Sequence, residues 1–373
     1  MTSPFLKDPP KAPTRVLIVD DSPLYRRILI KSVEALQEPV AVQTAPLGGV
    51  ALKKIPDFRP DIVLLDMEMP EMSGIEVLKA IRGNFPEVMV ILVSGVNSRS
   101  ADLTIEGLSA GAADFIPKPD GDNPEQNISE LTRRVKDAFS LASTRRFAQA
   151  ARRAVLGNDT GAEPAPPISR ARKAPALIPP RVEIVGIGIS TGGPNALDTM
   201  VRTISQAISV PIVIVQHMPP LFTQSLAKAL NGICPLPVSE AENNETLRAG
   251  RIYIAPGGLH VVVRKRKTDD TPTLVLHFND GPPVNSCKPS VDVLFQSLAE
   301  ATSKRTLAVV MTGMGQDGLV GVQKIKDAGG YCLTQDEETC TIYGMPYAVD
   351  KANLSDESLP LGDIAERIMA IAR

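Results

Sequence analysis

The sequence predicts an α/β protein made of two doubly wound, three-layer domains. Short runs rich in Val, Ile and Leu alternate with helical periods over residues 15–141, and the same alternation returns over residues 182–373. Residues 142–181 continue the last helix of the first half and then become rich in proline and polar residues, which is typical of a linker. Residues 1–14 form a short N-terminal tail.

The first half contains five strand-like runs, each followed by a helical period. The runs are RVLIVD (15–20), PVAVQTA (39–45), DIVLLD (61–66), EVMVILVS (87–94) and AADFIP (112–117). The helices are expected through RRILIKSVEAL, near Gly48–Asp57, through GIEVLKAIRGN, up to about Ala110 and from about Pro124. Strict alternation of this kind predicts a parallel, flavodoxin-like sheet covered by helices on both faces.

The second half repeats the alternation with different motifs, so it is not an internal repeat. Its strand candidates are RVEIVGIG (181–188), PIVIVQ, RIYIA, LHVVVRK, TLVLHF and LAVVMT. Helices are expected after Gly193, after Phe222, from Ser290 to Ala301 and after Gly318. The pattern predicts a mostly parallel sheet with an antiparallel, hairpin-like pair near residues 252–278.

The composition excludes several classes of protein. The formal net charge of the 373 residues is −2, so we expect no nucleic-acid partner, and the second half shows no helix-turn-helix pattern of a DNA-binding output. The apolar runs are too short to cross a bilayer and the N-terminus has no apolar signal core, so we expect a cytoplasmic protein without membrane insertion. The four cysteines show no CxxC spacing and are expected to be reduced, mostly buried thiols.

Polar residues follow the strand-like runs of the first half. Asp20 and Asp21 end the first run, Asp66 ends the third, Ser94 ends the fourth and Lys118 follows the fifth. The carboxyl ends of neighbouring parallel strands converge, and carboxylates placed there repel one another unless a hard cation such as Mg²⁺ lies among them. A nearby hydroxyl and ammonium complete a site that can hold a phosphoryl group. One such aspartate alone would more often be a helix cap.

This set resembles the receiver domain of bacterial response regulators. The motifs that carry the resemblance are VDDS (19–22), LLDMEMPEMSG (64–74), VSG (93–95) and DFIPKP (114–119). The resemblance implies that Asp66 is the phosphoacceptor. It also implies that Mg²⁺ is held by Asp20, Asp21, Asp66 and the backbone carbonyl of Glu68.

The same resemblance assigns the remaining polar positions. Ser94 and Lys118 would contact the phosphoryl oxygens, and Phe115 stands at the position of the aromatic switch residue, although an aromatic residue in a strand is more often plain core. The phosphodonor implied for such a domain is a histidine kinase of the CheA type.

A second set of polar residues follows strands of the second half. Ser190 comes directly after the run VEIVGIGI, within Gly188-Ile-Ser190-Thr-Gly192, which fits the G-x-S-x-G turn that exposes a serine at a helix N-terminus. His217 ends the next run, and Asp317 follows the run LAVVMT. Three strand ends would thus bring a nucleophile, a base and an orienting carboxylate to one edge of the sheet.

A glycine-rich turn of this kind has a competing interpretation, namely a dinucleotide-binding fingerprint. Gly186 and Gly188 begin that fingerprint, but Thr191 stands at its third glycine position. Gln216-His217 stands where the acidic residue of a dinucleotide site is expected. The fingerprint is therefore incomplete.

Three further alternatives concern the proposed triad itself. Ser190 could be a helix cap only, which is a common role of serine before Gly-Pro. The base could be His260 or His277, but the first opens a strand and the second lies inside one, where histidines are more often structural. The domain could also be a signalling scaffold that has lost turnover.

The second half resembles the catalytic domain of the chemotaxis methylesterase family, CheB. The motifs that carry this resemblance are IGISTGGP (187–194), VQHMP (215–219), GRIYIAPGGLH (250–260), SCKPSVDVLF (286–295) and MTGMGQDG (311–318). The resemblance implies that Ser190, His217 and Asp317 form the catalytic triad.

The resemblance also assigns positions around the serine. The backbone N–H of Met314 would help to stabilise the oxyanion, while Thr191 and Gly192 lie beside the nucleophile at the start of the helix. Two residues depart from the family pattern: Ile189 stands where a small residue is more common, and Cys287 stands where histidine is common. Neither departure removes a member of the triad.

The two resemblances together imply a phosphorylation-controlled hydrolase. Its substrates would be methyl-accepting chemoreceptors, whose glutamyl methyl esters it would hydrolyse and whose glutamines it would deamidate, without a metal or cofactor in the catalytic domain. In the family, the unphosphorylated receiver limits access to the catalytic cleft. We expect a monomer that is peripheral at receptor arrays.

Overall fold

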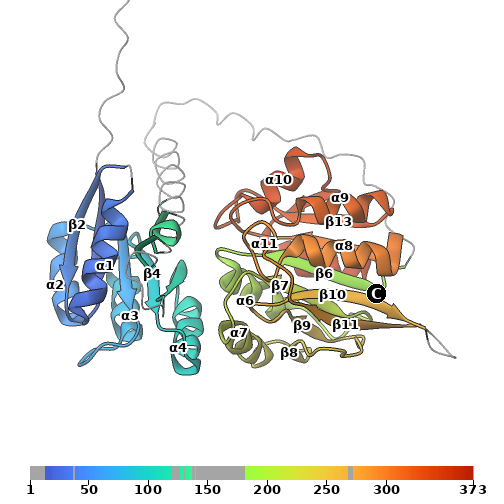
Figure 1. Cartoon of the computed structure of the whole chain (residues 1–373), viewed down its shortest axis with the longest axis horizontal. Helices are drawn as coiled ribbons and strands as arrows, with labels where there is room; N and C mark the ends of the chain where they lie inside the picture. Colours follow the sequence, from blue (N-terminus) through green and yellow to red (C-terminus); the bar gives the residue numbers. More distant parts are fainter. Residues whose placement is uncertain are drawn as a thin grey trace, which may run out of the picture. The chain divides into compact units, whose positions relative to one another are not determined.

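The chain forms two compact units, each built on its own parallel sheet (Figure 1). The computed structural model describes residues 13–36, 38–119, 127–129, 131–136, 139, 181–267 and 272–372. Residues 127–129 and 131–136 are helical, in line with the helix expected from about Pro124. The predicted linker, up to residue 180, lies outside the described residues.

The first sheet has the strand order β2-β1-β3-β4-β5, and every pairing in it is parallel. Its strands are β1 (Thr14–Val19), β2 (Val40–Ala45), β3 (Ile62–Asp66), β4 (Met89–Ser94) and β5 (Asp114–Pro117). The helices between them are α1 (Pro23–Glu34), α2 (Gly48–Phe58), α3 (Gly74–Asn84) and α4 (Ser98–Ser109). This order is that of the flavodoxin-like sheet predicted from the sequence, which is thereby confirmed.

Local sequence signals place the helices of this unit. The Ser22 side chain accepts a hydrogen bond from the backbone N–H of Tyr25 at the start of α1, and Pro23 occupies the first turn. Ser73 and Glu76 form a reciprocal capping box at the start of α3. Strands β3 and β4 are buried along their whole length, as expected for central strands covered on both faces.

The second sheet has seven strands in the order β14-β13-β12-β6-β7-β9-β8, again with parallel pairings throughout. Its strands are β6 (Ile184–Ile189), β7 (Ile212–Gln216), β8 (Val238–Glu240), β9 (Ile252–Ile254), β12 (Thr306–Val310), β13 (Tyr331–Gln335) and β14 (Glu357–Leu359). Strand β6 lies at the centre, between β12 and β7. Strands β8, β13 and β14 were not among those expected from the sequence.

Helices cover both faces of this sheet, so the second doubly wound domain is also confirmed (Figure 1). The helices are α6 (Gly193–Thr203), α7 (Phe222–Asn231), α8 (Val291–Thr302), α9 (Leu319–Asp327), α10 (Met345–Lys351) and α11 (Leu361–Ile371), with a 3₁₀ turn at Ser303–Arg305. Helix α8 packs closely on β6, because a Cβ added to Gly188 would lie 2.3 Å from the Val291 side chain. Glycine therefore permits the close helix–strand contact next to the predicted nucleophile.

The antiparallel pair expected near residues 252–278 is present, but it begins later than residue 252. The run RIYIA does not belong to an antiparallel pair: its core is β9, a buried strand paired in parallel with β7. The antiparallel hairpin consists of β10 (His260–Arg266) and β11 (Thr273–Asn279). Full burial on both faces distinguishes β9, whereas β10 becomes exposed towards its end. Among the described helices, none is long and apolar enough to cross a bilayer.

Candidate active site

The acidic residues predicted in the first unit lie together. Asp20 and Asp21 follow β1, Asp66 ends β3, and these two strands are neighbours in the sheet. One carboxylate oxygen from each of the three residues lies within 4.8 Å of the others. Asp20 and Asp66 are buried, whereas Asp21 is exposed. Of the three carboxylates, that of Asp21 is therefore the one exposed to solvent.

A lysine partly neutralises this cluster. Lys118 Nζ lies 2.8 Å from Asp66 Oδ2 and 2.9 Å from Asp20 Oδ2, and it also lies over the ring of Tyr25. Burial raises the pKa of Asp66 to about 6; the charge of Lys118 opposes this shift and that of Asp20 adds to it. One ammonium is therefore not enough to balance the buried carboxylates.

The donor set fits a hard divalent cation. Asp20 Oδ2 is buried and receives no hydrogen bond, although Lys118 lies within ion-pair distance, so this oxygen has lone pairs left for a ligand. Oxygen-only donors of this kind suit Mg²⁺. Glu68 is exposed and its backbone N–H donates to Asp66 Oδ1 at 3.3 Å, which places that residue directly beside the cluster.

The other predicted residues of this unit lie near the same sheet edge. Ser94 is buried at the end of β4, and its carbonyl oxygen accepts a hydrogen bond from the backbone N–H of Lys118 at 2.7 Å. Phe115 lies within β5 and is half-buried. The strand order therefore brings the phosphoryl-contact residues to the edge that carries Asp66.

The central strands of the second sheet deliver the predicted triad. Ser190 follows β6, His217 follows β7, and Asp317 lies in the turn between β12 and α9. Since β12, β6 and β7 are adjacent, all three residues lie at the same edge of the sheet. The backbone N–H of His217 donates to the carbonyl of Ile189 on the neighbouring strand. Because Ile189 directly precedes Ser190, this bond holds the histidine backbone next to the serine.

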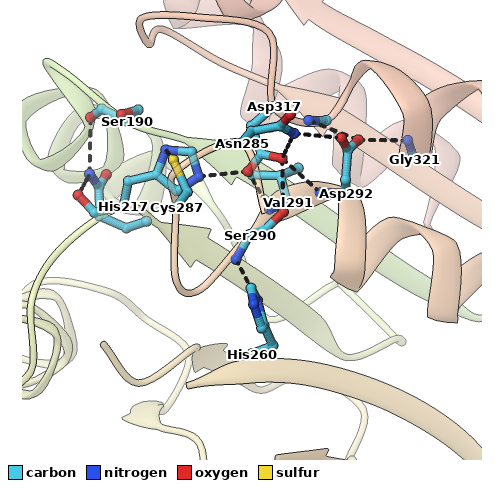
Figure 2. Close-up of polar contacts among 12 residues, drawn as sticks. Ser190, His217, His260, Asn285, Cys287, Ser290, Val291, Asp292, Asp317 and Gly321 are labelled. Carbon is cyan, nitrogen blue, oxygen red and sulfur yellow. Dashed lines mark hydrogen bonds and ion pairs between the residues drawn. The ribbon is translucent and has the colours of Figure 1, made fainter. Parts of the chain in front are cut away.

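His217 and Asp317 contact each other directly, across 100 residues of sequence. His217 Nε2 lies 2.8 Å from Asp317 Oδ2 (Figure 2). Burial alone would raise the pKa of Asp317, but the hydrogen bond and charge of His217, followed by other hydrogen bonds, outweigh burial and lower the pKa to about 2. Asp317 is therefore ionised and holds the Nε2–H tautomer of the neutral ring.

Asp317 is also held from the other side. Its carboxylate accepts hydrogen bonds from the backbone N–H groups of Val291 and Asp292, from Ser290 Oγ and from Asn285 Nδ2. Val291 and Asp292 are the first residues of α8, so Asp317 satisfies the N-terminal N–H groups of that helix.

A second aspartate reciprocates this contact. Asp292, on α8, accepts hydrogen bonds from the backbone N–H groups of Gly318 (3.0 Å) and Gly321 (2.7 Å), at the start of α9. Asn285 bridges the two aspartates, donating 2.8 Å bonds to Asp292 Oδ2 and Asp317 Oδ1 (Figure 2). Asp317 therefore caps the N-terminus of α8, and Asp292 on α8 caps the N-terminus of α9.

Sequence reasoning did not predict roles for Asn285, Ser290 or Asp292. All three belong to or adjoin the quoted segment SCKPSVDVLF. The signal that could have indicated them is Ser290 followed by an acid in the first turn of a predicted helix, which marks a helix N-terminus. Nothing local, however, indicates that the partner of this terminus is Asp317.

The other ring nitrogen of His217 faces a thiol. Cys287 Sγ lies 3.5 Å from His217 Nδ1 (Figure 2). Burial lowers the pKa of His217, but the hydrogen bonds to Asp317 and Cys287 outweigh burial and raise the pKa to about 9. Cys287, one of the two residues that depart from the family pattern, therefore directly contacts the candidate base His217.

Ser190 lies in a tight turn. Its backbone N–H donates to the Thr312 carbonyl, and a Cβ added to Gly313 would lie only 2.7 Å from Ser190 Cβ. Within the described part of the chain the Ser190 hydroxyl makes no hydrogen bond. Catalytic hydrogen bonds are often long or poorly aligned before substrate binds and tighten only in the complex, so Ser190 stays the candidate nucleophile.

Two backbone N–H groups, unpaired in the part of the chain that the structure describes, belong to the residues that follow Ser190 and its close neighbour Gly313. Gly192 has a positive φ of 77° and caps α6, which begins at the next residue. Among the described residues, the N–H groups of Thr191 and Met314 donate to no acceptor, and the Met314 side chain is exposed. The arrangement offers unpaired donors to negative charge that develops beside Ser190.

The alternative histidine bases have other surroundings. His260 is buried, and its Nδ1 accepts from the Ser290 N–H at 3.2 Å (Figure 2). This leaves Nε2 as the donor to the Pro282 carbonyl at 3.0 Å. Both nitrogens of His260 are therefore engaged. His277 lies inside β11, and burial together with Arg264 and Arg266 lowers its pKa. Only His217 combines an orienting carboxylate with a position beside a candidate nucleophile.

Both units of the chain match known protein families. Residues 185–368 match the family model described as CheB methylesterase, and residues 16–128 match the model described as response regulator receiver domain. A protein-glutamate methylesterase/protein-glutamine glutaminase of Trichodesmium erythraeum is 39% identical over 356 residues, which cover 95% of this chain and 98% of that relative.

Two further relatives illustrate the similarity. A protein of Desulfotalea psychrophila with the same name is 40% identical over 357 residues, covering 95% of this chain and 97% of the relative. Among solved structures, the Thermotoga maritima CheB methylesterase catalytic domain is 38% identical, with a TM-score of 0.49 over 51% of this chain and 98% of that chain.

Proposed function

Because the chain belongs to the family of protein-glutamate methylesterases/protein-glutamine glutaminases, we propose that it hydrolyses glutamyl methyl esters on methyl-accepting chemoreceptors and deamidates their glutamines. The observation that carries this proposal is the 2.8 Å contact between His217 and Asp317 at the strand end adjacent to Ser190. It is the base–acid half of a serine hydrolase triad.

The proposed reaction proceeds through an acyl-enzyme. Ser190 Oγ attacks the γ-carbonyl carbon of the receptor side chain while its proton passes to His217 Nδ1, the nitrogen that Asp317 leaves available. The N–H groups of Thr191 and Met314 hold the oxyanion. The proton on His217 then goes to the leaving methanol, or to ammonia from a glutamine, and water hydrolyses the acyl-enzyme to release glutamate.

One observation favours a second candidate for the nucleophile. Cys287, rather than Ser190, contacts His217 Nδ1 in the structure, so Cys287, His217 and Asp317 also form a nucleophile–base–acid series. Ser190 remains the better candidate because unpaired backbone donors lie beside it. In the proposed reaction the thiol must give up its contact with Nδ1 to the serine hydroxyl.

Substitution of each candidate separates the two nucleophiles. Ser190→Ala should abolish methanol release from methylated receptor membranes, whereas Cys287→Ser should retain it. Ser209→Ala, at an exposed serine outside the site, is the matched control and should behave as wild type. Near wild-type methanol release by Ser190→Ala, together with its loss in Cys287→Ser, would overturn the assignment of Ser190.

We further propose that phosphorylation of Asp66 by a CheA-type histidine kinase activates this hydrolase in the cytoplasm. Asp20, Asp21 and Asp66, with the carbonyl of Glu68, would hold Mg²⁺, which supplies charge neutralisation for the phosphoryl group. Lys118 and Ser94 would bind the phosphoryl oxygens. The support is the buried carboxylate oxygen that receives no hydrogen bond and the ammonium that already contacts Asp66.

Removal of the first unit tests this control. A fragment that begins near Arg181 should release methanol faster than the unphosphorylated full-length protein, and Asp66→Asn in the full-length chain should prevent activation by a small-molecule phosphodonor. The folded state of the fragment is checked by its thermal unfolding. A folded fragment with equal or lower activity would contradict the proposed inhibition.

A further inference from the structure

The pair formed by Cys287 and His217 has the chemistry of a metal site. Cys287 Sγ lies 3.5 Å from His217 Nδ1, on the side of the ring opposite Asp317 (Figure 2). One ligand atom from each of these three residues lies within 4.8 Å of the others. Thiolate and imidazole are the ligands that zinc prefers, in contrast to the oxygen donors around Asp66.

The separation of the two atoms suits a shared ion. In a tetrahedral zinc site, Zn–S and Zn–N bonds of the usual length place the sulfur and nitrogen roughly 3.6 Å apart. The observed 3.5 Å is close to this value, so an ion could join the two groups with only small movements. Cys287 is half-buried, which leaves room for water to reach the remaining coordination positions.

The ring is already oriented as in a metal-binding histidine. Because Nε2–H donates to Asp317, the lone pair of the neutral ring is on Nδ1, towards Cys287. Metal-bound histidines usually donate their other N–H to a carboxylate in this way, and that outer contact fixes the tautomer. Asp317 is itself held by Asn285, Ser290 and the start of α8, so the arrangement is preorganised.

We propose that Zn²⁺ binds to Cys287 Sγ and His217 Nδ1, with Asp317 as the outer carboxylate and two water molecules as the remaining ligands, and that it reversibly inhibits the hydrolase. Binding displaces the proton of the Cys287 thiol and, where His217 is protonated, also the proton on its Nδ1, and it needs no oxidant or reductant. The ion occupies the lone pair that accepts the Ser190 proton. The inhibition rests on the proposed function, whereas metal binding does not.

Co²⁺ in place of Zn²⁺ tests binding without reference to activity. Full-length protein is titrated with Co²⁺ in excess Mg²⁺, which fills the oxygen-donor site, and the thiolate-to-cobalt charge-transfer absorption is measured. We expect this band in wild type, in Ser190→Ala and in the control Cys234→Ser, and its displacement by Zn²⁺. Cys287→Ser should lack the band. A band of wild-type strength in Cys287→Ser, or no band in wild type, would overturn the proposal.

The activity arm measures methanol release over a range of Zn²⁺ concentrations. Wild type and Cys234→Ser should be inhibited alike and should recover when a chelator is added. Each variant is compared with its own zinc-free rate. Cys287→Ser should need at least about tenfold more Zn²⁺ than wild type for half-inhibition, since even the loss of a residue that only hydrogen-bonds to a metal ligand costs that much affinity. Equal sensitivity of Cys287→Ser would contradict inhibition through this pair. If wild type has no zinc-free activity while the cobalt band is present, the proposed function fails and the metal site stands.

Discussion

The two sites of this chain both lie where parallel strands end, but their buried aspartates differ in how they are satisfied. In the first unit, Asp20 Oδ2 receives no hydrogen bond, and one lysine serves two carboxylates. In the second unit, Asp317 accepts bonds from a histidine, an asparagine, a serine and the start of a helix.

This difference supports the separate roles proposed for the two sites. An under-satisfied group of carboxylates stores repulsion that an incoming cation relieves, so the first site is prepared for a ligand. A carboxylate with every lone pair directed at a donor stays ionised and fixed, so the second site is prepared to orient a base. The pKa values follow the same division: Asp66 is raised to about 6 and Asp317 is lowered to about 2.

The largest expected effect is that of Asp317→Asn. The amide cannot hold the His217 tautomer that leaves Nδ1 free, so we expect the rate of methanol release to fall by about 10⁴-fold. Phosphorylation at Asp66 should be unchanged, because the first site does not depend on this residue. The two readouts are methanol release and incorporation of labelled phosphate. A fall of less than tenfold would show that His217 needs no orienting acid.

Asp292→Ala should have the next largest effect. The change removes an acceptor from the N–H groups of Gly318 and Gly321 and from Asn285, so we expect a loss of about 2–3 kcal/mol in the free energy of unfolding. Denaturant unfolding of the catalytic fragment measures it. Asp292→Asn keeps one acceptor oxygen and should lose less. Equal stability of wild type and Asp292→Ala would mean that reciprocal capping contributes little.

The pH dependence of catalysis tests the contact of Cys287 with the base. Only neutral His217 accepts the serine proton, so kcat/KM should increase with pH towards about 9 in wild type. Cys287→Ser removes one cause of the raised pKa, and the acid limb should move to lower pH, by about one unit, with up to about tenfold more activity near neutrality. Cys234→Ser should leave the profile in place. If the acid limb of the pH profile of Cys287→Ser coincided with that of wild type, the thiol would not be a cause of the raised pKa of His217.

The same raised pKa has a consequence for folding. Protonated His217 is stabilised in the native state, so its contribution to stability is complete below its ordinary pKa of 6.5 and is lost as the pH rises through about 9.

The smallest expected effect is an increase in stability. Asp20→Asn keeps the oxygen that accepts the N–H of Ser22 but removes a buried charge that lacks a hydrogen bond. Without Mg²⁺ we expect the variant to be more stable by about 1 kcal/mol, as seen in thermal unfolding. With Mg²⁺ the wild type should gain more than the variant. A loss of stability without Mg²⁺ would mean that the ion pair with Lys118 already balances Asp20.

The positions at strand ends could be predicted from the sequence because their signals are local. Asp20, Asp66, Ser190 and His217 each follow a run of apolar residues that forms a strand, and the runs and their helices are separated by polar or glycine-rich turns. Such periodicity depends on neighbours a few residues away. The fold class, and the strand ends at which these residues lie, could therefore be predicted from the chain alone.

Only the tertiary structure decided which groups meet. The neighbourhood of β12, β6 and β7 joins His217 to Asp317 over 100 residues of sequence. The same long-range packing turns Nδ1 of the ring towards Cys287 and makes Asp317 and Asp292 cap each other's helices. These contacts depend on the strand order and on the close approach of α8 to β6, and neither can be predicted from the periodicity of apolar residues in the sequence.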